Sequence, residues 1–361
     1  MIYVILGTKA QIIKMAPVMK EMDRRGIGYR YYSTGQHQET MKDLHADFGV
    51  REPDASLVPP GDVVTFRGMA LWLLRLTGKM FCRDKKLFPP SENRLALVHG
   101  DTASTLIGAI VGKRNGCRIG HVESGLYSGR LFDPFPEEAI RRMAFRLADI
   151  LFCPGEWAMG NVRDLAREVV NTGANTLADS LKISQEQALE PAPLPFPMGQ
   201  PFGVVSIHRT ENITTRQQVR RIVDILEEIS ESYPLLVVMH KTTENALQRR
   251  GLLERIEMNP NIRLSPRYRY FDFVSILKRA AFVISDGGSN QEECAYLGKP
   301  LLLLRRRTER IEGLGQNCIV SGYDRDEITT FIRDHSEYAV HSDNAKASPS
   351  ALIVDYCIRF V

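Results

Sequence analysis

The chain has 361 residues, 43% hydrophobic and 25% charged. This is the balance of a folded globular protein and excludes wholesale disorder and collagen-like structure. Its 47 basic and 43 acidic residues leave a net charge of +4, which is too small and too dispersed to predict a nucleic-acid partner. The length favours two domains.

The cysteine spacing and the lengths of the apolar runs indicate the cellular compartment of the protein. The six cysteines include no Cys-x-x-Cys pair, so the sequence predicts neither a zinc site nor a disulfide framework and favours a reducing compartment. The apolar start at residues 1–7 is too short for a signal peptide, and no run reaches the roughly 18 apolar residues of a membrane helix. We therefore expect a cytoplasmic protein with no membrane partner.

Short apolar runs, each followed by a turn and a helix-like stretch, recur along the chain. Unbroken runs of this length are typical of strands buried on both faces of a parallel sheet. We expect an α/β protein with an N-terminal domain at 1–185 and a C-terminal domain at 198–345, separated by the alternating prolines of 190–197. The predicted strands are Ile2–Leu6, Leu95–His99, Arg118–Val122 and Ile150–Cys153 in the first half, and Val204–His208, Leu235–Met239, Ile262–Ser265, Phe282–Ser285 and Leu301–Leu304 in the second.

Two further segments have a helical pattern. Apolar residues at 71–76 predict an amphipathic helix that packs against the core. The final residues, 346–361, carry a helix-like apolar stripe.

Polar residues that directly follow the strands of the first half are candidates for chemistry, because ligands bind at the carboxyl ends of parallel strands. Lys9 and Lys14 lie at a helix start after the first strand, where they would suit a phosphate, although solvated lysines fit equally well. Asp101 and Glu123 follow two strands expected to be neighbours, about 4.8 Å apart, so both carboxylates can share one site. The alternative for Asp101 is a helix N-cap.

A predicted helix after the aromatic and proline-rich loop at 132–136 begins with Glu137 and Glu138. The helix dipole alone favours acidic residues in a first turn, which accounts for at least one of them. Arg141 follows Glu137 by four residues, so an intrahelical ion pair is an alternative to a functional role.

The second half offers a site for a diphosphate. His208 ends one predicted strand, and Asp286-Gly-Gly-Ser289 follows another and opens a helix. Backbone amides at that helix start would suit a diphosphate, and Glu292 or Glu293 could accept hydrogen bonds from ribose hydroxyls. A glycine turn that only reverses the chain is the alternative. The segment 305–310 adds arginines.

Together these segments resemble the non-hydrolysing UDP-N-acetylglucosamine 2-epimerase family. The resemblance runs from Gly7 to about Glu312, and it implies two Rossmann-like domains that face each other across a cleft, as in GT-B glycosyltransferases. The matching motifs are His99-Gly-Asp-Thr102, His121-Val-Glu-Ser-Gly125, Pro136-Glu-Glu138 with Arg141, His208-Arg209, Asp286-Gly-Gly288 with Gln291-Glu-Glu293, Gly298-Lys-Pro300 and Thr308-Glu-Arg310.

The resemblance implies a role for each candidate residue. The acid/base carboxylates are Asp101, Glu123 and Glu137, and His208 is catalytic or contacts the diphosphate. Gly287, Gly288 and Ser289 hold the phosphates, Glu293 holds the ribose and Phe273 borders the uracil. The remaining substrate-binding residues are Lys9, Lys14, Arg141, His240 and Arg310. The domains are expected to close over the substrate, with 346–361 near their junction.

Three segments depart from the family pattern. The usual Gly-Thr-Arg-Pro-Glu opening reads Gly7-Thr-Lys-Ala-Gln11, which replaces a guanidinium with the ammonium of Lys9. The usual Asp-Ser-Gly-Gly loop reads Asp286-Gly-Gly-Ser289, which moves the hydroxyl. The segment Gln36-His-Gln-Glu39 differs from the motif that the family uses for allosteric activation, so we do not expect such activation here.

The implied reaction is reversible C2 epimerisation of a UDP-2-acetamido sugar, UDP-GlcNAc to UDP-ManNAc or a close analogue, for cell-surface polysaccharide precursors. The proton on C2 has no adjacent carbonyl, so its removal requires that the C1–O bond to UDP breaks to give a 2-acetamidoglucal. Cations and helix amides then stabilise the departing diphosphate while a carboxylate takes the proton. We expect no metal or nicotinamide cofactor, and a homodimer.

Three other functions remain open at this point. A hydrolysing 2-epimerase needs the same carboxylates but releases UDP and free N-acetylmannosamine or a 2,4-diacetamido analogue. A GT-B glycosyltransferase typically needs one base, and three carboxylates argue against it. An inactive nucleotide-sugar-binding regulator would bind without forming product.

Overall fold

The computed structural model describes residues 1–35, 41–57, 83–127, 137–187, 193–197, 199–341 and 347–361. The chain divides into two compact units, one formed by Met1–Ile183 with Ala345–Val361 and the other by Ser184–Asn344. The predicted amphipathic helix at 71–76, the loop at 132–136, the 36–39 motif and part of the proline-rich linker lie outside the described residues. None of the described helices is long and apolar enough to cross a membrane.

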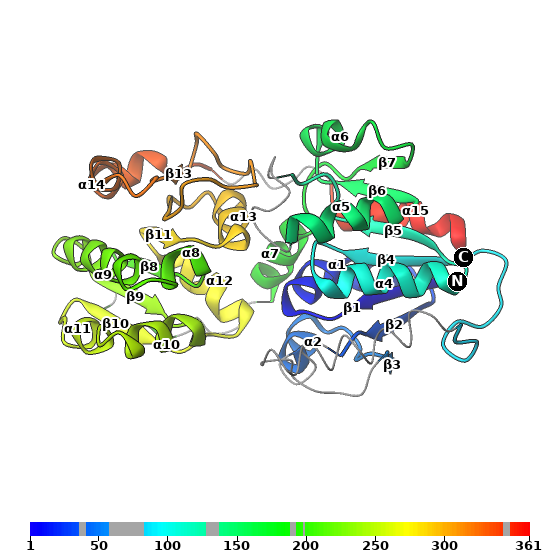
Figure 1. The fold of residues 1–361 in the computed structure, drawn as a ribbon, viewed down its shortest axis with the longest axis horizontal. Helices are drawn as coiled ribbons and strands as arrows, with labels where there is room; N and C mark the ends of the chain where they lie inside the picture. The colour runs from blue at the N-terminus through cyan, green and yellow to red at the C-terminus, as the bar shows by residue number, and fades with distance from the viewer. Residues whose placement is uncertain (36–40, 58–82, 128–136, 188–192, 198, 342–346) are drawn as a thin grey trace. The chain divides into compact units, whose positions relative to one another are not determined.

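The first unit contains a parallel sheet with the strand order β3-β2-β1-β4-β5-β6-β7 (Figure 1). Its central strands are buried along their whole length, as their apolar runs require. Helix α1 packs against α2 and against α15, and α4 packs against α5. The strands are β1 (Ile2–Leu6), β2 (Tyr29–Ser33), β3 (Ala55–Ser56), β4 (Leu95–His99), β5 (Arg118–Val122), β6 (Ile150–Cys153) and β7 (Glu168–Asn171), and the helices are α1 (Lys9–Arg24), α2 (Lys42–Phe48), α4 (Ala103–Arg114), α5 (Glu137–Leu147), α6 (Glu156–Val162), α7 (Leu177–Glu186), α15 (Pro349–Cys357) and the short η3 (Ile358–Phe360).

The second unit contains a parallel sheet with the strand order β10-β9-β8-β11-β12-β13. The strands are β8 (Gly203–Ser206), β9 (Leu235–Val238), β10 (Ile262–Ser265), β11 (Phe282–Ser285), β12 (Leu301–Leu303) and β13 (Cys318–Val320), and the helices are α8 (Thr210–Ile213), α9 (Arg216–Ser230), α10 (Lys241–Arg249), α11 (Leu253–Glu257), α12 (Tyr270–Arg279), α13 (Gly288–Leu297), α14 (Arg325–Asp334) and η2 (His335–Tyr338).

Each sheet reverses its strand order once. In the first unit β1 lies between β2 and β4, and in the second β8 lies between β9 and β11. Chain segments leave the carboxyl ends of such a strand pair in opposite directions, which opens space for a ligand. The loops at these two points carry the candidate residues around Lys9 and Asp101 in the first unit, and around His208 and Gly287 in the second.

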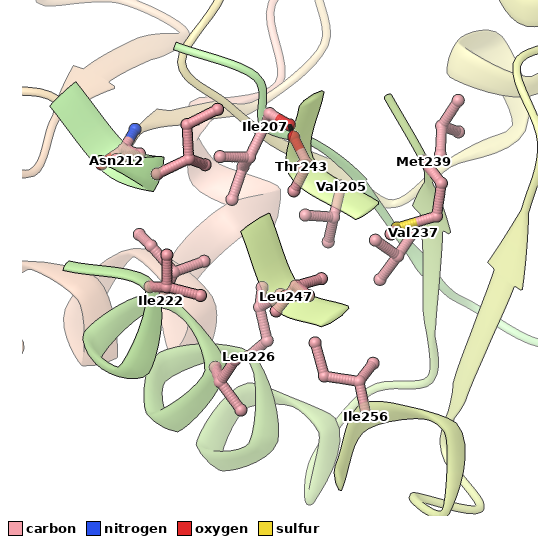
Figure 2. A pocket seen from close by; sticks show the side chains of 14 residues that line it. Val205, Ile207, Asn212, Ile222, Leu226, Val237, Met239, Thr243, Leu247 and Ile256 are labelled. Carbon is pink, nitrogen blue, oxygen red and sulfur yellow. Dashed lines mark hydrogen bonds between the residues drawn. The ribbon is translucent and has the colours of Figure 1, made fainter. Parts of the chain in front are cut away.

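The core of the second unit contains a small apolar cavity, shown in Figure 2. It lies between strands β8 and β9 and the helices near them, and Val205, Leu226, Val237 and Leu247 are among its lining residues. Its volume of about 20 Å³ is enough for one water molecule, but an apolar lining leaves such a space dry. The cavity is therefore a feature of core packing.

All nine predicted strands are present, although β8, β9 and β12 end one or two residues earlier than predicted. The sequence did not reveal β2, β3, β7 and β13. Strand β2 contains the exposed Arg30, which interrupts the apolar run, and β7 is half-buried rather than buried. These strands lie away from the centres of their sheets, where burial on both faces is not required.

The C-terminal segment belongs to the first unit. Ile353, Val354 and Cys357 of α15 are buried, and this helix packs against α1. The amino group of Met1 donates to the carbonyl of Phe360 at 2.6 Å, which ties the two ends of the chain together. Two expectations stay predictions. They are the domain boundaries at 1–185 and 198–345, and the place of residues 346–361 near a domain junction.

Two helical glycines should respond oppositely to replacement by alanine. A Cβ at Gly112 of α4 would lie 2.8 Å from Ile119 and 2.9 Å from Ala96, whereas a Cβ at Gly160 of α6 would meet nothing within 4 Å. We expect Gly112→Ala to lower the free energy of unfolding by about 1–3 kcal/mol through overpacking. Gly160→Ala should raise it by up to about 1 kcal/mol, because alanine favours helix more than glycine. Urea unfolding measures both changes in the free energy of unfolding. An increase for Gly112→Ala would contradict the close packing described around this glycine.

Candidate functional site

Gln11 joins the turns that follow β1 and β4. Its Oε1 accepts hydrogen bonds from the backbone amides of Gly7 at 2.8 Å and Thr8 at 3.2 Å. Its Nε2 donates to the carbonyl of His99 at 2.7 Å and to Thr105 Oγ1 at 2.9 Å. A glutamate could accept the first two bonds but could not donate the others. The departure from the family pattern at this position therefore has a structural use that the sequence did not disclose.

Glu123 lies at the centre of a buried polar cluster directly after β5. Its Oε2 accepts from Lys14 Nζ and from Asn175 Nδ2 at 2.8 Å, and it lies 3.2 Å from His99 Nε2. All four side chains are buried. Glu123 has a φ of 65°, in the left-handed region that non-glycine residues rarely adopt, and these contacts hold it there. The solvated alternative is thus wrong for Lys14, whereas Lys9, the first residue of α1, is half-buried.

Asp101 forms an ion pair with Arg141 of α5, which also pairs with Glu138. The Glu138 side chain is fully buried, but that of Asp101 is 28% exposed, so its carboxylate remains accessible. The N-cap of α4 is Thr102, which shares a capping box with Thr105. The N-cap alternative for Asp101 is therefore wrong, and a charge pair joins the turn after β4 to helix α5.

Glu137 begins α5 and lies in a different environment from the other two carboxylates. Its Oε2 is buried and has no hydrogen-bond partner within the part of the chain that the structure describes. The ion pair that Arg141 makes within the helix is with Glu138, three residues before it. A buried carboxylate oxygen that lacks a donor is available to a ligand or a proton.

His121 has a structural role in the same region, although the sequence analysis identified it only as the first residue of the motif at 121–125. Its Nδ1 lies 2.5 Å from Ser124 Oγ and its Nε2 lies 2.7 Å from the carbonyl oxygen of Gly100. Burial of the ring lowers the pKa of His121 to about 4. The neutral imidazole therefore links the turn after β4 to the turn after β5.

In the second unit the rings of His208 and His240 stack, with centroids 4.4 Å apart and planes 14° from parallel. They follow the neighbouring strands β8 and β9. Burial lowers the pKa of both rings, and for His240, where His208 and Arg267 add to the effect, it falls to about 3. His240 Nε2 lies 3.2 Å from Ser206 Oγ. Two imidazoles thus lie side by side at the carboxyl edge of this sheet.

The Asp286-Gly-Gly-Ser289 loop brings backbone close to other groups. Gly287 is the N-cap of α13 and Gly288 its first residue, and Ser289 is exposed. A Cβ at Gly288 would lie 2.7 Å from Arg310 Nε, and a Cβ at Gly287 would lie 3.1 Å from His208 Cε1. The glycines therefore permit close approach rather than a left-handed turn. Backbone amides, a histidine and an arginine converge at this helix start.

Two acidic residues, Glu292 and Glu293, lie about one turn after the start of α13. Arg310 pairs with the fully buried Glu292, while Glu293 accepts from Asn290 Nδ2 at 2.8 Å. Phe273 of α12 is partly buried and packs against the apolar core beneath. The structure therefore places Glu293, Arg310 and the loop at residues 286–289 in one region. No group of described His, Cys, Asp and Glu residues is arranged to hold a metal ion.

Residues 20–350 match the model of a protein family described as UDP-N-acetylglucosamine 2-epimerase. The chain belongs to this family. A UDP-N-acetylglucosamine 2-epimerase of Methanococcus maripaludis is 28% identical over 357 residues, which cover 94% of this chain and 93% of the relative. A UDP-2,3-diacetamido-2,3-dideoxy-D-glucuronate 2-epimerase of Pseudomonas aeruginosa is 29% identical and covers 95% of this chain and 94% of its own.

Solved structures show the same fold. The UDP-GlcNAc 2-epimerase of Neisseria meningitidis bound to UDP-GlcNAc has a TM-score of 0.84 and 24% identity, and covers 99% of both chains. The Methanocaldococcus jannaschii enzyme in complex with UDP-GlcNAc and UDP has a TM-score of 0.80 and 22% identity, and covers 100% of this chain and 99% of its own. The predicted family, the epimerase class of enzyme and the two-domain α/β fold class are confirmed.

The buried His121 should make stability depend on pH. Its pKa of about 4 in the folded chain lies below the ordinary value of 6.5, so the unfolded chain binds this proton first as the pH falls. We expect about 3 kcal/mol of unfolding free energy to be lost between pH 6.5 and 4 through this group. A His121→Asn variant should lack that part of the pH dependence in urea unfolding.

Proposed function

We propose that the protein catalyses the reversible C2 epimerisation of a UDP-2-acetamido sugar. The proposal rests above all on the polar cluster in the first unit, where Asp101 faces Arg141 and Glu123 faces Lys14 at the carboxyl edge of one sheet. Family membership supports it, because relatives that match almost the whole chain carry epimerase names. UDP-N-acetylglucosamine and UDP-N-acetylmannosamine, or close analogues, are the proposed pair.

The first half of the reaction breaks two bonds. A carboxylate of the first unit takes the proton from C2, the C–H electron pair forms the C1=C2 double bond, and the C1–O bond breaks so that UDP leaves with its electrons. Arg141 of α5 fixes the Asp101 carboxylate, while Lys14 and the side-chain amide of Asn175 fix that of Glu123, which orients a proton acceptor before the substrate arrives. The neutral product is a 2-acetamidoglucal.

The second half returns UDP to C1 and a proton to the opposite face of C2. Two faces require two proton-transfer groups, and the first unit supplies more than one carboxylate. Glu137, whose buried Oε2 has no donor among the described residues, is suited to carry a proton. Asp101 and Glu123, which have cation partners, are suited to accept one.

The second unit supplies the groups for the leaving diphosphate. The α13 amides at Gly288 and Ser289, the His208 ring and the Arg310 guanidinium converge at the helix start. Such a constellation stabilises the negative charge that develops as the C1–O bond breaks. Glu293 is placed one turn further along the helix, where it can accept from ribose, and Phe273 lies on the neighbouring α12.

Two broader features are also proposed. The buried, free cysteines of the described chain suit the cytoplasm, where nucleotide sugars for polysaccharide precursors are made. We propose a homodimer, and light scattering of the purified chain reads its mass directly.

The C2 exchange should be visible in deuterated water. With UDP-N-acetylglucosamine, or its 3-acetamido uronic-acid analogue, the product should carry deuterium at C2 with UDP still attached, as read by proton NMR. A hydrolysing enzyme would use the same carboxylates but would release stoichiometric free sugar. Absence of turnover for every UDP-2-acetamido sugar would contradict both reactions.

The proposed division of roles predicts two classes of variant. Asp101→Asn, Glu123→Gln and Glu137→Gln should lower kcat by about 10²-fold or more while UDP affinity stays nearly unchanged, because they remove proton transfer. Glu293→Gln should instead weaken UDP binding. Steady-state kinetics and calorimetric UDP titration separate the classes, and equal losses of UDP affinity in all four variants would show that the first three are structural.

A further inference from the structure

A buried carboxylate organises the turn that carries His208. The side chain of Asp286 is fully buried, and its Oδ1 accepts from the backbone amide of His208 at 3.0 Å. Its Oδ2 accepts from the amide of Arg209 at 2.9 Å and from Asn212 Nδ2 at 2.8 Å. Asp286 thus fixes the backbone of His208 from the next strand of the sheet, although it directly precedes the phosphate loop in sequence.

Asn212 completes this arrangement with both ends of its amide. Besides Asp286, its Nδ2 donates to the carbonyl of Leu304 at 3.1 Å, and its Oδ1 accepts from the hydroxyl of Tyr323 at 2.7 Å. Only 1% of Asn212 is exposed, so these groups have no water to replace a lost partner. The bonds run from Tyr323 through Asn212 and Asp286 to the His208 amide.

Tyr323 is held in an unusual backbone conformation to make its bond. Its φ is 64°, and Tyr323 and Glu123 are the non-glycine residues with positive φ in the described part of the chain. The amide of Tyr323 donates to Ser321 Oγ at 3.2 Å, which supports the turn. Such a conformation costs free energy and persists when surrounding contacts impose it.

We propose that Asn212 and Tyr323 are positioning residues that act on UDP binding through His208. The inference rests on the proposed function, in which His208 contacts the diphosphate. Asn212 holds the Asp286 carboxylate in place, Tyr323 holds Asn212, and the carboxylate sets the position of the His208 backbone. A Cβ at Gly287 would lie 3.1 Å from His208 Cε1, so the imidazole packs against the loop at residues 286–289.

A buried asparagine elsewhere in the same unit provides the matched control. Asn317 is also 1% exposed, and its Nδ2 donates to the carbonyls of Cys294 at 2.9 Å and Lys299 at 2.7 Å. It directly precedes β13 and therefore lies at the amino edge of the parallel sheet, away from the phosphate loop. Asn317→Ala should lower the melting temperature without changing UDP affinity.

A double-mutant cycle tests the inference, with UDP as the probe in calorimetric titration. Tyr323→Phe should weaken UDP binding about two- to tenfold, because it removes one hydrogen bond to Asn212, and Asn212→Ala about tenfold or more, because it removes the bonds to Asp286, Leu304 and Tyr323. In a His208→Ala background the same substitutions should change UDP affinity little, since their effect passes through the missing ring. Tyr323→Phe removes one hydroxyl, so it remains informative if Asn212→Ala folds poorly.

The results of this cycle distinguish a failure of the positioning role from a failure of the proposed epimerisation reaction. Equal losses in both backgrounds, or wild-type affinity in Tyr323→Phe and Asn212→Ala, would overturn the positioning role. Wild-type UDP affinity and turnover in His208→Ala would overturn the role of His208 and the inference with it. Because the cycle is measured on UDP affinity, absence of turnover in the wild type would instead contradict the proposed reaction while the cycle still decides the positioning role.

Discussion

A carboxylate removed from water must receive hydrogen-bond donors, and the loops of both units are built around this requirement. In the first unit Glu123 receives donors from α1 and from the segment before α7, which fixes three segments that are far apart in sequence. In the second unit Asp286 accepts from two backbone amides of the turn after β8 and from the side-chain amide of Asn212 in α8. Each buried charge therefore fixes loops at the edge where substrate chemistry is proposed.

The two charges act in different ways. Glu123 is paired with the ammonium of Lys14 and lies beside other ionisable groups, an environment suited to proton transfer. Asp286 accepts hydrogen bonds from neutral amides and lies 3.4 Å from His208 Nδ1, while Arg305 and Arg310 pair with other carboxylates. A parallel sheet places all such groups at one edge, so the same architecture can supply proton transfer in one unit and anion binding in the other.

Much of this arrangement was readable from the sequence. Asp101 and Glu123 follow largely apolar runs, and the order of those runs was enough to predict adjacent strands and a shared edge. The ion pair of Lys14 with Glu123 was not predictable, because 109 residues separate the partners and no pattern links them. The bonds of Gln11, Asn212 and Tyr323 were hidden for the same reason, since amide and phenol groups show no periodicity that marks their partners.

Reversible breakage of the C1–O bond is the central claim, and positional isotope exchange measures it most directly. UDP-N-acetylglucosamine labelled with ¹⁸O in the oxygen that joins C1 to the β-phosphorus would be incubated with the protein and followed by ³¹P NMR. If UDP leaves and returns, the label spreads from the bridging to the non-bridging β-phosphate oxygens in unconsumed substrate and in epimerised product. Epimerised nucleotide sugar with its label still entirely in the bridge would contradict the account.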